Sequence, residues 1–76
     1  MVLPLIPLQM QAHCLASELN DIHPQLANAD MPDVWWEHLH DTWEDKLAEL
    51  AQLLSRLMGQ ERGERWMAKH VLPPSW

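Results

Sequence analysis

The chain has no tyrosine, no phenylalanine and a single cysteine among its 76 residues. Tyrosine, phenylalanine and the β-branched residues favour strands, and because the first two are absent and the β-branched residues are few, the composition argues against a β-sheet. Cys14 has no second cysteine to pair with, which excludes a disulfide within the chain and favours a reducing compartment. The sequence therefore predicts an all-α protein of the cytoplasm.

Glycine is scarce as well. Gly59 and Gly63 are the only glycines, so the sequence contains no Gly-rich phosphate-binding loop. The serines lack a strand–turn–helix setting. A nucleophilic cysteine needs a nearby base or positive charge, and Cys14 lies in a region without Lys or Arg. We therefore expect no enzymatic activity and no cofactor.

Long apolar runs are also missing. No stretch reaches the roughly 18 apolar residues that a membrane-spanning helix needs. The first residues, MVLPLIPLQMQA, are apolar, but they carry no basic group and are interrupted by Pro4 and Pro7. We therefore expect neither a signal peptide nor a membrane partner.

Basic residues are absent from the first half of the chain. Residues 1–45 contain eight acids and no Lys or Arg, whereas residues 46–76 contain five basic residues and three acids. Phosphate binding needs clustered cations, so direct binding of nucleic acid is not expected. A basic surface on another protein, or the basic end of a second copy, fits this distribution.

Apolar residues from Leu8 to Ile22 recur at the three-and-four spacing of one helical face. Pro24 cannot donate a main-chain hydrogen bond, so a first helix is predicted over about residues 5–22. The segment HPQLANADM that follows is rich in Pro, Asn and Asp, which is typical of a connection.

A second helix is predicted over about residues 31–58. Asp30 is its candidate N-cap, and Pro32 suits the first turn. At 100° per residue, an apolar stripe runs along one face from Trp36 onward. A helix continuing past Gly59 would place charged side chains on that stripe, so Gly59 is expected to end it.

A short third helix is predicted over about residues 61–71, closed by Pro73 and Pro74. Residues 1–76 would form one domain, an antiparallel helical hairpin with this third helix folded back on it. The first helix, roughly 25 Å long, cannot cover a second helix of roughly 42 Å. A chain this short also buries little apolar surface, so we expect a homodimer that forms a helical bundle.

The stretch of residues 33–45, DVWWEHLHDTWED, contains three tryptophans and five acids. On the helical wheel, Trp36, Leu39 and Trp43 lie on the stripe, and Trp35 lies about 100° away on a partly exposed shoulder. Exposed apolar strips and large aromatic side chains are typical of interfaces. The candidate partner-binding residues are Trp35, Trp36, Trp43, Asp41, Asp45 and Leu53.

A ridge beside the stripe carries Glu37, His40 and Glu44. The Glu37-x-x-His40 spacing is similar to the element that offers metal ligands in di-iron helical bundles, and Glu18 is the candidate carboxylate from the first helix, duplicated by a dimer. This predicts, as an alternative, a helical oligomer that binds a divalent transition metal. The competing interpretation is that His40 hydrogen-bonds Glu44 at the rim of the core.

The function that these patterns favour is a small non-catalytic interaction module, such as an inhibitor, an adaptor or a chaperone-like protein. Its acidic, tryptophan-rich helix face would bind a partner protein that has a basic surface. The metal-binding oligomer is the second hypothesis, and mimicry of nucleic-acid charge by the acidic face is the third.

Overall fold

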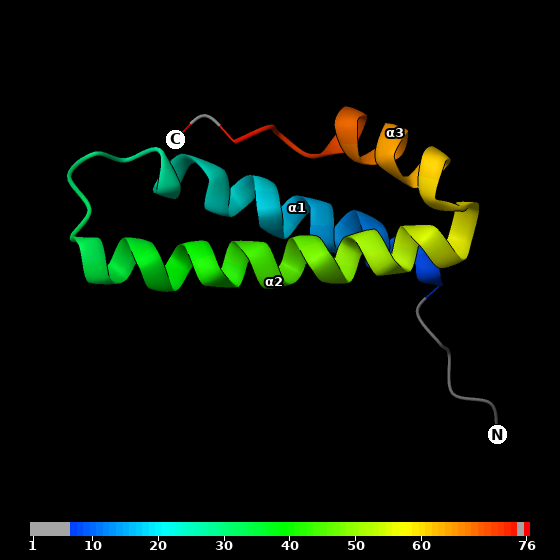
Figure 1. Cartoon of the computed structure of the whole chain (residues 1–76), viewed down its shortest axis with the longest axis horizontal. Coiled ribbons are helices and arrows are strands. Elements are labelled where there is room, and N and C mark those ends of the chain that lie inside the picture. The colour runs from blue at the N-terminus through cyan, green and yellow to red at the C-terminus, as the bar shows by residue number, and fades with distance from the viewer. Residues whose placement is uncertain (1–6, 75) are drawn as a thin grey trace, which may run out of the picture.

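The computed structural model describes residues 7–74 and 76, which form three helices. Helices α1 (Leu8–Leu26) and α2 (Asp33–Met58) lie side by side and antiparallel, and α3 (Gln60–His70) turns back along α2 (Figure 1). No strand occurs over these residues, and the expected all-α hairpin with a short third helix is confirmed. Within the same residues, no helix is both long enough and apolar enough to cross a membrane.

The core lies between the apolar faces of α1 and α2. Leu19 and Leu26 of α1 and Leu50 and Leu54 of α2 are fully buried. Small residues of α1, such as Ala16, are buried with them. Full burial of a leucine contributes about 1.5–3 kcal/mol, so these four side chains are a major source of stability. The predicted stripe of α2 is therefore the core-facing side of that helix.

The first helix does not end before Pro24, as the sequence predicted; it continues to Leu26 with Pro24 inside it. Proline inside a helix costs about 3 kcal/mol. The last turn recovers a similar amount, because Leu26 is buried and its carbonyl accepts the Nε1–H of Trp36 at 2.8 Å. The packing of this last turn against α2 thus outweighs the helix-breaking effect of Pro24. Residues 5 and 6, the predicted start, lie outside the described residues.

The second helix begins at Asp33, two residues later than predicted. Asp30 is not its cap; instead, the Asp30 N–H donates to Asn28 Oδ1 at 3.1 Å within the connection. Pro32 precedes the helix with φ −57° and ψ 142°, an extended conformation. Proline also disfavours helical geometry in the residue before it, which explains why residue 31 stays outside α2.

Gly59 separates α2 from α3, as expected. Its φ is +85° and its ψ is 161°, a conformation that residues with a Cβ rarely adopt. The chain therefore changes direction within a single residue. Gly63 then lets α3 approach α2 closely, because a Cβ at this position would lie 3.0 Å from the Leu54 Cβ.

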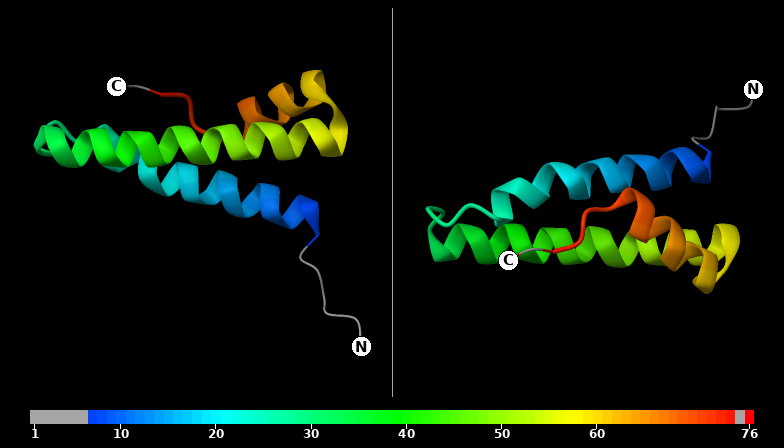
Figure 2. Two further views of the ribbon diagram at one scale, coloured as in Figure 1. Left: turned by 60° about the horizontal axis from the view of Figure 1, so that its bottom comes forward. Right: turned by 90° about the horizontal axis from the view of Figure 1, so that it is seen from above.

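Helix α3 and residues 71–74 cover the side of the hairpin that α1 leaves open (Figure 2). Trp66 and Met67 of α3 pack on the core, and Val71 is buried in it. Residues 71–74 then run over the line where α1 and α2 meet, toward the connection between these helices. The stripe of α2 is thus covered within one chain, and its burial does not require a second copy.

Candidate interaction surface

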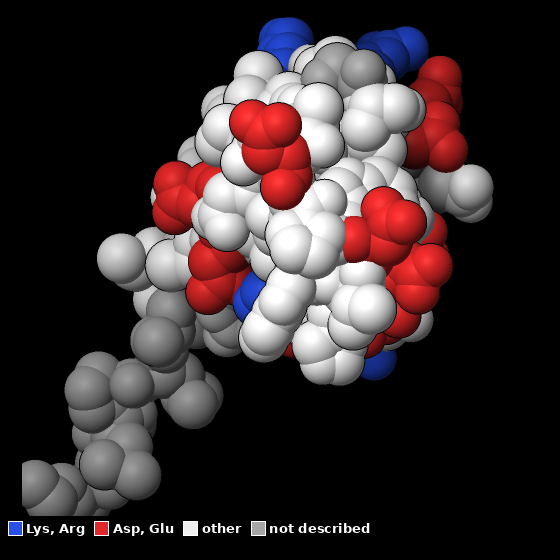
Figure 3. Space-filling view, turned by 90° about the vertical axis from the view of Figure 1, so that its left-hand side faces the viewer, with Lys and Arg blue, Asp and Glu red and all other residues white. Residues whose placement is uncertain are grey.

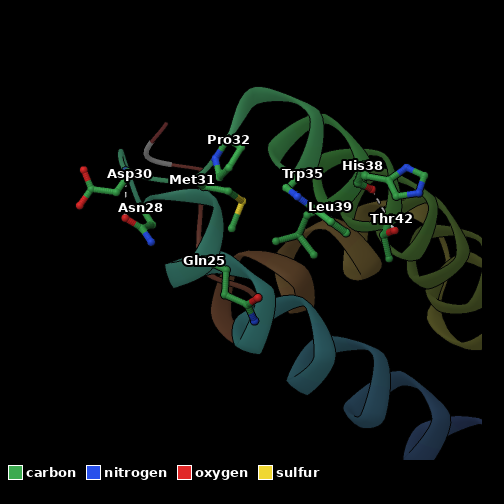
Figure 4. Close-up of a pocket in the computed structure, with 9 residues that line it drawn as sticks. All are labelled: Gln25, Asn28, Asp30, Met31, Pro32, Trp35, His38, Leu39 and Thr42. Carbon is green, nitrogen blue, oxygen red and sulfur yellow. Dashed lines mark hydrogen bonds between the residues drawn. The ribbon is translucent and has the colours of Figure 1, made fainter.

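An open hollow of about 570 Å³ lies where α1 connects to α2, and Trp35 is part of its wall (Figure 4). Met31 and Leu39 add apolar surface, while Gln25 and Thr42 bring polar groups from α1 and α2. The Trp35 side chain is 66% exposed. Single exposed apolar residues are common, but an exposed indole beside a hollow offers a partner a place to anchor.

The connection between the helices shapes this hollow. Asn28 organises it by accepting the Asp30 N–H on its side chain and the Met31 N–H on its carbonyl, the latter at 3.4 Å. Asn and Asp commonly form such local turns. Pro32 then directs the chain into α2, whose first turns carry Trp35 and His38. The hollow is therefore built from the hairpin turn and the helix ends that flank it.

The end of the molecule that carries the hollow is acidic. Asp30, Asp33 and Asp41 are exposed there. Figure 3 shows acidic side chains spread over this end, with Lys and Arg mainly at its margins. Residues 7–45 contain no Lys or Arg, so no basic side chain of that segment neutralises the acids. The electrostatic field at this end is therefore negative.

Lys46 is the first basic residue, and it binds Glu18 across the two helices. The Lys46 Nζ donates to Glu18 Oε2 at 2.7 Å. This hydrogen bond raises the pKa of the Lys46 ammonium above its ordinary value of 10.5. Both side chains are partly exposed, so the pair is a modest link between α1 and α2 rather than a major source of stability.

The structure divides the residues predicted to bind a partner. Trp35, Asp41 and Asp45 are exposed. Trp43 is only 6% exposed, and Trp36 is half-buried with its indole hydrogen-bonded to Leu26. Leu53 is also half-buried against the core. Of the predicted residues, Trp35, Asp41 and Asp45 are therefore exposed, whereas Trp36, Trp43 and Leu53 pack in or against the core.

The four candidate metal ligands do not form one cluster within a chain. His40 Nδ1 lies 3.2 Å from Glu44 Oε1, which is the geometry of the simpler interpretation at the rim of the core. Glu18 binds Lys46 instead, and Glu37 is exposed. Among residues 7–74 and 76, no three His, Cys, Asp or Glu side chains are grouped closely enough to hold a metal ion.

Sequence reasoning missed several residues of the hollow, including Gln25, Met31 and Thr42. Met31 and Pro32 belong to a connection whose shape is set by Asn28, and no periodic pattern reveals it. Thr42 had a weak signal, because it follows Trp35 by seven residues and so lies on the same face of α2. Gln25 was missed because α1 was expected to end before it.

Comparisons of the chain with protein-family models, with curated proteins and with solved structures gave no match.

Proposed function

We propose that this chain is a non-catalytic interaction module whose hairpin end binds a basic surface on a partner protein. The observation that carries the proposal is the exposed Trp35 beside an open hollow, on an end of the molecule rich in acids. Interfaces of this kind combine a central aromatic anchor with a polar and charged rim. An inhibitor, an adaptor and a chaperone-like protein would all use such a surface.

The anchor and the charges have different roles. An indole buries about 150–250 Å², so covering the exposed part of Trp35 contributes about 2–4 kcal/mol. The acids around it contribute less to affinity, because exposed charges are screened by salt. They accelerate encounter with a cationic surface and disfavour acidic partners. Trp35 should thus govern the dissociation rate, and Asp41 and Asp45 should govern the association rate.

The test is affinity capture from the native host with the wild-type chain and with Trp35→Ala, followed by binding kinetics with the purified partner. Trp35→Ala should weaken binding by about 2–3 kcal/mol, mainly through faster dissociation. Charge reversal of Asp41 and Asp45 to Lys should slow association and flatten its dependence on salt.

Val34→Ala is the matched control. Val34 is 77% exposed and adjacent in sequence, but it does not line the hollow. It should therefore leave the affinity within about twofold of wild type. Unchanged capture by Trp35→Ala together with both charge reversals would contradict the proposal. Competition by duplex DNA would instead favour mimicry of nucleic-acid charge.

Metal binding is the second candidate, in which the adjacent His40 and Glu44 side chains would supply two of the ligands. Because Glu18 binds Lys46, further ligands would have to come from a second chain, so this candidate requires the proposed homodimer. Light scattering gives the mass in solution, and elemental analysis of protein purified without chelator gives the metal content. A monomer without stoichiometric metal, with unchanged melting in EDTA, would exclude it.

A further inference from the structure

Residues 71–74 and 76, which we call the tail, lie on the hairpin in the manner of a bound peptide. Asn20 of α1 brackets Val71: its Nδ2 donates to the His70 carbonyl at 2.8 Å, and its Oδ1 accepts the Leu72 N–H at 2.9 Å. His23 Nε2 lies 2.9 Å from the Pro73 carbonyl. These contacts recognise the main chain, and the Val71 backbone between them is extended.

The end of this segment rests on an aromatic cluster. The centroid of the Trp76 ring lies 5.1 Å from the centroid of the Trp43 ring, at an interplanar angle of 86°. It also lies 5.1 Å from the His23 ring and 6.3 Å from the His40 ring. Edge-to-face contacts at such distances are favourable. The main-chain contacts at one end and the ring contacts at the other define what we call the tail groove.

The hairpin itself holds the tail groove in shape. His40 stacks on Trp36 with ring centroids 4.8 Å apart and also contacts Glu44. Trp36 is fixed by its hydrogen bond to the Leu26 carbonyl. None of these supporting contacts involves the tail. The aromatic wall therefore has its own support, as expected of a preformed binding site.

The fit of the tail is good but incomplete. Trp76 remains 36% exposed and Leu72 49% exposed. The Nε1–H of Trp43 is buried and has no hydrogen-bond acceptor among the described residues. An unpaired buried donor is costly, so the packing of the tail on Trp43 leaves a polar group of this ring unsatisfied. Val71 is buried in the core, whereas Leu72 and Trp76 stay partly exposed, so the tail is held unevenly along its length.

We propose that the tail groove is a second binding site, for an extended, proline-containing segment of a partner protein that carries a large aromatic residue. Proline-rich segments bind aromatic-lined grooves at low conformational cost, and side chains that bind their main chain add affinity. The chain's own tail occupies the groove until the partner displaces it. The site is separate from the hollow beside Trp35, and it does not depend on the function proposed above.

The test uses a fluorescent peptide with the sequence of residues 70–76, HVLPPSW, and the full-length chain. Wild-type protein should bind it weakly, because a tethered tail competes at an effective concentration of about millimolar. Trp76→Ala loosens the tail and should tighten peptide binding about tenfold in fluorescence anisotropy. Adding Asn20→Ala should reverse this gain, since both contacts that bracket Val71 are lost.

Gln25→Ala is the matched control for Asn20→Ala. Gln25 also carries an amide on α1, but its hydrogen bond goes to the Asp21 carbonyl and not to the tail. A second measurement avoids the Asn20 substitution and any effect on folding: a peptide with N-methyl-leucine in place of leucine lacks the N–H that Asn20 accepts, and should bind about tenfold more weakly to Trp76→Ala.

Equal peptide affinity in the wild type and Trp76→Ala would overturn the proposal, as would binding unaffected by N-methylation. If the wild-type protein is a dimer and the free peptide dissociates it, the occupant of the groove is the tail of a second copy. That result would overturn the assignment of the groove to a different partner protein.

Discussion

Trp36 and Trp43 lie about two turns apart on α2 and differ in how their indole N–H groups are satisfied. The Trp36 Nε1–H donates to the Leu26 carbonyl at 2.8 Å, whereas the Trp43 Nε1–H is buried without an acceptor among the described residues. Replacement of either tryptophan by phenylalanine removes the indole N–H and substitutes a single smaller ring for the two-ring indole. The two substitutions therefore form a matched pair that isolates the hydrogen bond.

Trp36→Phe should lower the free energy of unfolding by about 2 kcal/mol, because it loses a net hydrogen bond of about 1 kcal/mol and leaves the Leu26 carbonyl without that donor. Trp43→Phe removes a donor that costs about 1–3 kcal/mol to bury unpaired. This gain offsets the loss of packing, so its net change should lie within about 1 kcal/mol of zero.

Urea denaturation followed by circular dichroism measures both changes. A chain of this size has a stability on the order of 5 kcal/mol, so a difference of about 2 kcal/mol is well resolved. Equal destabilisation by the two variants, or a larger effect at Trp43, would refute the reasoning. It would mean that packing of the larger ring, and not the hydrogen bond, dominates at both positions.

Three further predictions concern the helix junction, the core and the interhelical ion pair. Gly59→Ala should lower stability by about 2 kcal/mol, because φ +85° strains a residue with a Cβ; unchanged urea midpoints would contradict this. Leu54→Ala should cost about 3 kcal/mol in the same assay, since Leu54 is fully buried, whereas half-buried Leu53→Ala should cost less; equal losses would disprove the assigned core. The Lys46 pKa is raised above 10.5 by Glu18, so the pair stabilises the fold fully below that pH and its contribution is lost as pH rises through the higher folded-state pKa. Stability measured from about pH 9 to about pH 12 should therefore fall more steeply in the wild type than in Glu18→Gln, and parallel curves would show that the pair contributes nothing.

The sequence predicted the helices well where the pattern was long and periodic. The stripe of α2 and its end at Gly59 are confirmed, because each depends on residues within a few turns of one another. The helix ends near Pro24 and Pro32 were wrong. Pro24 is a strong local signal for a helix end, but burial of Leu26 and its contact with Trp36 outweigh that signal. At the start of α2, Asp30 takes part in the turn at Asn28 and therefore does not cap the helix.

In the candidate site as well, features of a single helix were predicted and features built by several elements were not. The exposure of Trp35, Asp41 and Asp45 was predicted from their angles on one helix, and the structure confirms it. The hollow beside Trp35 was not predicted, because its walls come from α1, the connection and α2 together. The position of Trp76 was left open by the sequence, and the structure places it against Trp43 and His23.

What the sequence by itself determined is the all-helical character, the apolar stripe and the acidic first half, since composition and periodicity are properties of neighbouring residues. Only the tertiary structure decided which indole N–H is paired and where the tail lies. These outcomes depend on residues such as Asn20 and His70, which are 50 positions apart and form a hydrogen bond because Gly59 reverses the chain. No local pattern encodes a contact of that range; it arises when the folded helices bring distant donors and acceptors together.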